Sequence, residues 1–206
     1  LAMRGVVRLA DCAEVETVSA QEAQGRYRLP VKAYAAQNLW ELGSCLTGFA
    51  AGVPRYPALR LNMYTIRNGY FATGQDHAGM ILTETGLAVQ EAGMFSLPAR
   101  QGAQTANLGP ISETLFDDVF IGFDWGWINW YHWLCFALTR CSLAVDHVPP
   151  GCAIILPDHA RAGHAQFSAA SWSQSLAAFG LADRVTAVPP GVYRARTIRF
   201  LWTDPG

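Results

Sequence analysis

The chain has 206 residues and a formal net charge of −1; 51% of the residues are hydrophobic and only 15% are charged, which is enough apolar material for the core of one domain or slightly more. The lack of a basic block excludes the electrostatic surface on which nucleic-acid binding usually depends. No apolar run reaches the roughly 18 residues that a membrane span needs, and the N-terminus, LAMRGVV, has no signal-peptide core, so we predict no transmembrane segment.

The five cysteines favour a reduced compartment. Their number is odd and no two have CxxC spacing, which disfavours a disulfide framework. We therefore predict a cytoplasmic protein, either free or peripheral to a membrane. The sequence starts at Leu1 and ends in Asp204-Pro205-Gly206, a turn directly after a predicted strand, which favours a fragment of a longer protein.

Residues 1–60 predict an irregular N-terminal region. Alternating polar and apolar residues over 14–18 indicate one strand, and residues 31–46 indicate an irregular helix. The glycines and prolines between residues 48 and 57 mark loops.

Residues 61–112 predict a β-rich meander. The run MYTIRNGYFAT is rich in β-branched and aromatic residues. Two short apolar runs, 80–83 and 87–90, flank Glu84-Thr85-Gly86 and predict a hairpin. Residues 96–112 contain two prolines and two glycines and predict a loop.

Residues 113–206 alternate between strand and helix patterns. The predicted elements are a strand at 117–122, a helix after Gly126, a strand at 153–156, a helix at 164–179 that stops at Gly180, and strands at 184–188 and 192–202. This order predicts an α/β unit with a mostly parallel sheet. Ligands of such sheets bind beyond the carboxyl ends of the strands, the place that residues 122–129 occupy.

The central helix, in FDWGWINWYHWLCFALTRC, is apolar on nearly every side, which predicts a buried helix. Asn129 and His132 share one face, and Arg140 follows two turns later. A buried stripe of amide, imidazole and guanidinium needs partners, and a ligand cleft would supply them. The alternatives are that Asn129 caps the helix, that His132 bonds the backbone near Gly126, and that Arg140 only serves the helix C-terminus.

Four tryptophans surround these polar residues. Trp125, Trp127 and Trp130 have the chemistry to stack on a sugar ring; core packing is the alternative, favoured for Trp130 and Trp133 over the two rings beside glycines.

The acidic and histidine residues of the chain do not predict a metal centre. The adjacent Asp117 and Asp118 should point to opposite faces of a strand, unlike an Asp-x-Asp metal pair. A metal site built from Asp158, His159 and His164 is the weaker alternative to exposed loop residues, so we predict no metal. No glycine-rich phosphate loop occurs.

One segment resembles a known family. Asn129-Trp130-Tyr131-His132-Trp133-Leu134, followed by Leu138-Thr139-Arg140, is similar to the Asn-Tyr-Tyr-His-Trp-Leu segment of glycosyltransferase family 61, which includes bacterial transferases of the capsular-polysaccharide type. The later AIILPD and RVTAV and the earlier MYTIRNGYFATGQDHAGMILTETGLAVQEA also resemble the family's order. The resemblance covers roughly residues 61 to 204.

The resemblance implies the N-terminal, acceptor-side, Rossmann-like half of a GT-B-type glycosyltransferase, preceded by the β-rich segment. Such enzymes transfer a sugar, with inversion and without an obligatory metal, from a nucleotide-sugar co-substrate to a polysaccharide or glycoconjugate acceptor. No other cofactor is implied. The C-terminal, donor-binding half, with the family's His-Gly-Ala-Gly segment, has no counterpart here and is expected as a further part of the same protein.

The residue roles follow from this resemblance. We predict catalytic roles for His132 and Asn129, and substrate binding by Trp125, Trp127 and Arg140. A neutral imidazole can accept the proton of the acceptor hydroxyl, and Arg140 has the charge to pair with phosphate.

Two residues depart from the family pattern: Thr139 replaces a common Pro, and Phe136 replaces a common Glu or Asp one turn after His132. If the family's carboxylate orients the imidazole, this chain lacks it at that position. A non-catalytic carbohydrate-binding or scaffolding module is therefore the alternative function. A hydrolase is disfavoured because the chain has no GxSxG elbow.

Overall fold

The computed structural model describes residues 1–18, 60–74, 77–93, 106–162 and 167–204. The chain divides into two compact units. The first comprises 1–16 and 63–202 and contains nearly all described elements; the second comprises 17–62 and 203–206. The predicted helix at 31–46 lies outside the described residues, as does the first part of the helix predicted at 164–179.

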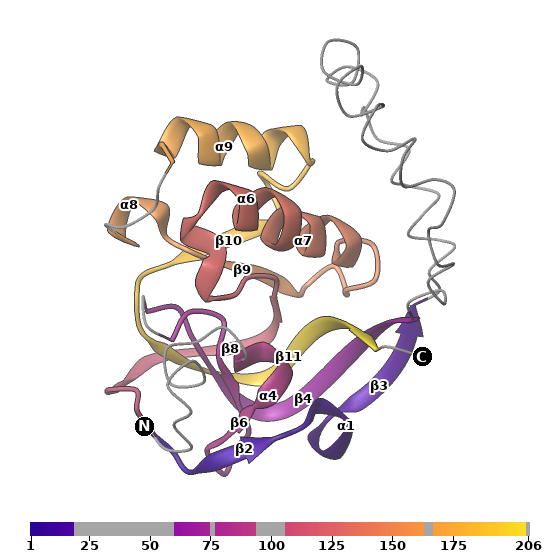
Figure 1. The fold of residues 1–206 in the computed structure, drawn as a ribbon, viewed down its shortest axis with the longest axis vertical. Helices are drawn as coiled ribbons and strands as arrows, with labels where there is room; N and C mark the ends of the chain where they lie inside the picture. Colours follow the sequence, from indigo (N-terminus) through magenta and orange to yellow (C-terminus); the bar gives the residue numbers. More distant parts are fainter. Residues whose placement is uncertain (19–59, 75–76, 94–105, 163–166, 205–206) are drawn as a thin grey trace, which may run out of the picture. The chain divides into compact units, whose positions relative to one another are not determined.

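The described elements are strands and short helices (Figure 1). The strands are β1 (Ala2–Met3), β2 (Gly5–Val7), β3 (Glu14–Val18), β4 (Arg60–Ala72), β5 (Ile81–Leu82), β6 (Leu87–Val89), β7 (Ala106–Asn107), β8 (Ile111–Ile121), β9 (Ala153–Pro157), β10 (Val185–Val188) and β11 (Val192–Asp204). The helices are α1 (Leu9–Cys12), α4 (Gln90–Gly93), α6 (Trp130–His132), α7 (Thr139–Ala144), α8 (His159–Ala162) and α9 (Ala169–Ala178), with a 3₁₀ turn at Trp125–Ile128 and a π-helical segment at Trp133–Leu138.

The protein is a mixed α/β structure with a mostly parallel sheet. The main sheet has the order β10-β9-β8-β11-β4-β5-β6-β2, and β3 also pairs with β4. Strands β10, β9, β8 and β11 form consecutive parallel pairs. The strand, helix, strand, helix, strand, strand order predicted for residues 113–206 is therefore confirmed.

The strand order changes direction at β8. From β8 the chain moves outward to β9 and β10 and then places β11 on the other side of β8. Ligands of open α/β sheets bind at such reversals, beyond the carboxyl ends of the strands. The residues that directly follow β8, from Gly122 onward, lie at this place.

The hairpin predicted around Gly86 is confirmed. Strands β5 and β6 are antiparallel, with Leu82 opposite Ala88, and Gly86 adopts φ +83° in the turn. A second glycine at positive φ, Gly79 (φ +80°), precedes β5. A Cβ on Gly79 would lie 2.5 Å from the backbone oxygen of Phe123, so only glycine lets this loop approach the end of β8.

The N-terminal residues are more regular than predicted. The strand predicted at 14–18 is confirmed as β3, but β1, β2 and α1 precede it. Strand β2 pairs parallel with β6, and β1 pairs antiparallel with β7. These short strands are specified by partners more than 80 residues away, which local periodicity cannot show.

Helices α6, α7 and α9 lie together on one side of β9 and β10 (Figure 1). Their common core is the fully buried Trp133. Its ring stacks on Trp172 of α9 at 6.0 Å between centroids, and its Nε1 donates to Ser175 Oγ at 2.8 Å. Ser168 caps α9 by accepting from Ser171 N, and Gly180 (φ +66°) follows its end, as the sequence predicts.

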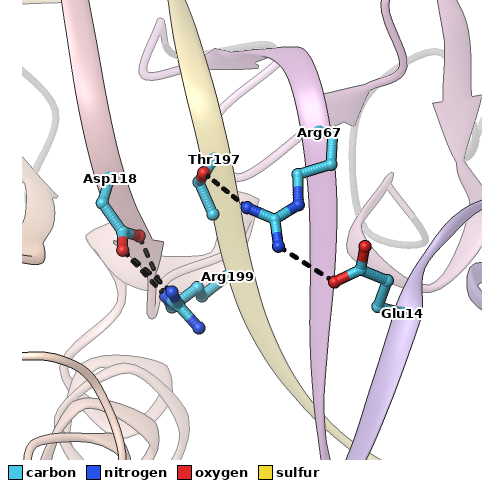
Figure 2. Close-up of polar contacts among 5 residues, drawn as sticks. All are labelled: Glu14, Arg67, Asp118, Thr197 and Arg199. Atoms are coloured by element: carbon cyan, nitrogen blue, oxygen red, sulfur yellow. Dashed lines mark hydrogen bonds and ion pairs between the residues drawn. The ribbon is translucent and has the colours of Figure 1, made fainter.

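Polar side chains cross the middle of the sheet (Figure 2). Asp118 on β8 accepts from Arg199 on β11, with Nε–Oδ1 and Nη2–Oδ2 distances of 2.9 Å. Next to this pair, Arg67 on β4 donates to Thr197 Oγ1 at 3.3 Å and to Glu14 on β3 at 3.0 Å. Asp117 instead pairs with Arg196 at 3.0 Å, and its exposed fraction is 85% against 23% for Asp118. The adjacent aspartates are thus separate ion pairs and not a metal pair.

Two buried thiols give the fold a pH dependence. Burial raises the pKa of Cys141 to about 12, and burial followed by the charge of Asp118 raises the pKa of Cys152 to about 12, against 9.0 for an ordinary thiol. The unfolded chain loses these protons at lower pH than the folded chain, so their stabilising effect is complete below pH 9 and is lost as the pH rises toward 12. We expect the free energy of unfolding to fall by up to about 1.4 kcal/mol per thiol per pH unit above pH 9, measured by urea denaturation. A Cys141→Ala variant with an equally steep decline would contradict the contribution of that thiol.

Candidate active site

The site begins where β8 ends. Asp124 is 7% exposed, and its Oδ1 accepts from the backbone N–H of Gly126 at 2.8 Å. This bond caps the 3₁₀ turn Trp125–Ile128. The turn redirects the chain from the sheet into α6 and holds a buried carboxylate at the carboxyl end of a central strand.

Asn129 caps the helix, as one of the two predictions from the sequence states. Its Oδ1 accepts from the backbone N–H groups of Tyr131 and His132 at 2.9 and 3.4 Å. The cap fixes where the helix starts and therefore where His132 lies. The backbone engages the side-chain oxygen of Asn129, and the catalytic role predicted for this residue remains a prediction.

The central helix contains a π-helical segment that the sequence analysis did not predict. Thr139 Oγ1 donates to the carbonyl of Leu134, five residues earlier, at 3.0 Å. π-Helical segments are rare in proteins, but those that occur are frequently found at functional sites. This contact gives a structural role to Thr139, one of the two positions that depart from the family pattern.

The central helix is not buried on all sides, contrary to the prediction. Tyr131 is 63% exposed and Phe136 is 42% exposed. The π-helical segment brings residues five apart onto one face, and the two rings lie 6.1 Å apart between centroids. Together with His132 they form an exposed aromatic cluster.

His132 lies between this cluster and the backbone. Its ring centroid is 6.0 Å from that of Tyr131 and 5.2 Å from that of Phe136. A Cβ built on Gly126 would lie 2.4 Å from Nδ1, so the imidazole packs directly on that glycine. Nδ1 is buried and has no hydrogen-bond partner among the described residues. The structural alternative predicted from the sequence is a hydrogen bond from His132 to the loop at Gly126. In the structure Nδ1 packs against this loop but forms no hydrogen bond with it.

Arg140 lies over an aromatic ring of the neighbouring strand. Its guanidinium carbon is 5.1 Å from the ring centroid of Phe200 on β11. Burial lowers the pKa of Arg140, and the charge of Asp124 opposes this effect. Its buried Nη1 has no hydrogen-bond partner in the described part of the chain. A buried donor without a partner is costly, and an anionic ligand would satisfy it.

The burial of Trp127 and Trp130 is the reverse of the prediction. Trp127 is 2% exposed and packs edge-on against Trp133 at 6.4 Å, whereas Trp130 is 38% exposed and packs on Phe167 at 5.0 Å. The 3₁₀ turn reverses the expected burial because it directs Trp127 inward before the helix begins. Trp125 is half-buried on the same turn. Trp127 is thus a core residue; sugar stacking by Trp125 remains a prediction.

His159, which follows β9, stabilises the fold through a hydrogen bond and ring packing. His159 Nε2 donates to the carbonyl of Phe167 at 2.8 Å, and its ring packs against Trp127. Across the described ranges, no group of three His, Cys, Asp or Glu side chains is arranged to hold a metal ion.

Asp124 is a site residue that was not predicted from the sequence. The ideal Cβ position of Gly126 lies 3.0 Å from Asp124 Oδ1 and 2.4 Å from His132 Nδ1, which makes the carboxylate and the imidazole neighbours across this glycine. An aspartate directly after a buried strand and before Gly126 was the available signal. The structure thus brings together Asp124, His132 and Arg140, with Asn129 as the cap that positions the helix.

Comparison with protein-family models, with curated proteins and with solved structures found no match. In the described residues, no helix has the length and apolarity required to cross a membrane.

Proposed function

We propose that this chain is the acceptor-side, Rossmann-like part of an inverting glycosyltransferase similar to family 61, acting on a polysaccharide or glycoconjugate acceptor. The observation that carries the proposal is the place of His132, at the carboxyl end of a central parallel strand and beside exposed aromatic rings. The motif resemblance and the reversal of strand order at β8 support it.

The proposed reaction uses the residues in distinct roles. His132 accepts the proton of the acceptor hydroxyl while the hydroxyl oxygen forms a bond to the anomeric carbon of the donor sugar. The bond from that carbon to the nucleoside diphosphate breaks, and the diphosphate leaves with the electron pair. Arg140 has a buried Nη1 that lacks a hydrogen-bond partner among the described residues and could bind an anionic group.

The test is turnover of nucleotide sugars by the complete protein that contains this chain. A panel of donors, incubated with and without oligosaccharide acceptors, is assayed for nucleoside diphosphate and for the elongated product. We expect release that depends on an acceptor and a product of inverted anomeric configuration. Failure of every donor to react, with acceptor binding retained, would overturn the transferase and leave the binding module.

The binding module is supported by one observation. Phe136 packs on the imidazole of His132 on the side where the family pattern has a carboxylate. A protein that binds sugars without transferring them would keep the aromatic cluster and would not need an oriented base.

Both functions predict that the aromatic cluster binds the acceptor. We expect Tyr131→Ala to weaken oligosaccharide binding about five-fold, about 1 kcal/mol, because a sugar face would lose a flat apolar partner. Isothermal titration calorimetry measures the affinity. Leu115→Ala is the control, since Leu115 is also exposed, at 48%, but lies on β8. Equal affinities of the Tyr131→Ala variant and the unchanged chain would remove the cluster from the binding surface.

A further inference from the structure

We infer that Asp124 is the carboxylate that orients His132, in place of the acidic side chain that the family pattern has at position 136. The inference rests on the proposed function for its catalytic consequence, but its geometric content is independent of it. Asp124 is a positioning residue in this scheme, because it acts on the imidazole and not on the sugar.

The geometry around Gly126 places the two groups side by side. Asp124 Oδ1 and His132 Nδ1 both lie within 3.0 Å of the position that a Cβ on Gly126 would occupy. Any side chain at position 126 would separate them. Gly126 is not among the residues at positive φ, so its backbone angle does not require glycine. The close packing of the two side chains does.

The contact also determines which imidazole nitrogen faces the substrate. Nδ1 is buried against Gly126, so Nε2 is the nitrogen that remains for an acceptor hydroxyl. A neutral imidazole accepts a proton at Nε2 only when Nδ1 carries the hydrogen. That N–H needs an acceptor, and Asp124 is the carboxylate beside it. The pair is not hydrogen-bonded in the structure, as is frequent for catalytic contacts before substrate binds.

The surroundings leave the carboxylate of Asp124 able to accept a further hydrogen bond. Asp124 accepts one hydrogen bond from Gly126 N–H through Oδ1, which leaves further acceptor capacity on the carboxylate. Arg140 attracts it electrostatically from the same helix that carries His132. When His132 takes the proton of the acceptor hydroxyl, it becomes an imidazolium whose charge the buried Asp124 stabilises.

The alternative is that Asp124 serves only as the cap of the 3₁₀ turn. The Asp124→Asn variant separates the two roles, because the asparagine Oδ1 can still accept from Gly126 N–H. It removes the negative charge that favours a hydrogen on Nδ1, and it places an amide donor where the second carboxylate oxygen was.

The first measurement is the tautomer of His132 by ¹⁵N NMR of the chain with and without Asp124→Asn. We expect the hydrogen on Nδ1 in the unchanged chain, and a shift of population toward hydrogen on Nε2 in the variant. Asp118→Asn is the matched control: it removes a partly buried carboxylate from β8 that pairs with Arg199, so the tautomer of His132 should not change. Identical tautomer populations in the unchanged chain and the Asp124→Asn variant would overturn the inference.

The second measurement is sugar transfer by the complete protein. Asp124→Asn is expected to lower kcat about 100-fold with little change in the acceptor KM, because orientation of the base matters only in the reaction step. Unchanged kcat in a protein that transfers sugar would overturn the positioning role and leave the proposed function intact. Absence of transfer by the unchanged protein would instead overturn the proposed function, and the tautomer measurement would still decide whether Asp124 orients His132.

Discussion

Replacing His132 with alanine is expected to lower the rate of sugar transfer by about 10²- to 10⁴-fold, the range that general-base catalysis contributes. The variant loses the proton acceptor beside the exposed rings of Tyr131 and Phe136. The fold should persist, because the buried Nδ1 has no hydrogen-bond partner among the described residues and its removal leaves no donor or acceptor unsatisfied. The measurement is kcat and KM for donor and acceptor in the complete protein.

His159→Ala is the matched control for this experiment. Its imidazole donates to the carbonyl of Phe167 and packs against Trp127 and Trp172, so its loss should lower the free energy of unfolding without a specific effect on kcat of the folded fraction. The expected outcomes are therefore opposite: His132→Ala is stable and slow, and His159→Ala is less stable and active. Unchanged kcat in His132→Ala would remove this residue from the reaction.

The elements that sequence reasoning found are those with local signals. The hairpin of β5 and β6 is marked by Gly86, and the end of α9 by Gly180, both at positive φ. The C-terminal part of β8, together with β9 and β10, consists of short apolar or β-branched runs separated by helical patterns, whereas the polar first part of β8 lies partly in the predicted loop. The position of β11 next to β8, and the pairing of β2 with β6, depend on contacts between distant residues and have no local signature.

The candidate site was predicted in part for the same reason. Asn129 and His132 are three residues apart on a helix, so spacing alone placed them together, and the cap was among the predicted roles. Asp124 and His132 lie on either side of Gly126 only because the chain folds back in the 3₁₀ turn. The π-helical segment follows directly, and Tyr131 before it and Phe136 within it are exposed on a helix that apolar composition predicts to be buried. Neither irregularity has a signal in hydrophobic periodicity.

Trp133→Ala is expected to lower the free energy of unfolding by about 3–5 kcal/mol, the range for removing a buried aromatic side chain. Trp133 is 0% exposed, and its ring stacks on Trp172 and Phe167 at 6.0 and 5.8 Å. The truncation leaves a cavity between the central helix and α9. Urea denaturation followed by circular dichroism measures the change.

Two further variants separate packing from hydrogen bonding in this core. Trp133→Phe retains a stacked ring but loses the bond from Nε1 to Ser175 Oγ, so we expect a smaller loss, about 1–2 kcal/mol. Ser175 Oγ also donates to the carbonyl of Trp172 at 2.7 Å, which keeps it satisfied in that variant. Trp130→Ala is the control for an aromatic ring on the same helix that is 38% exposed, and it should cost less than Trp133→Ala. If the two alanine variants were equally stable, Trp133 could not be the residue that joins α9 to the helix that carries His132, and the rigid support of the site would have to come from elsewhere in the fold.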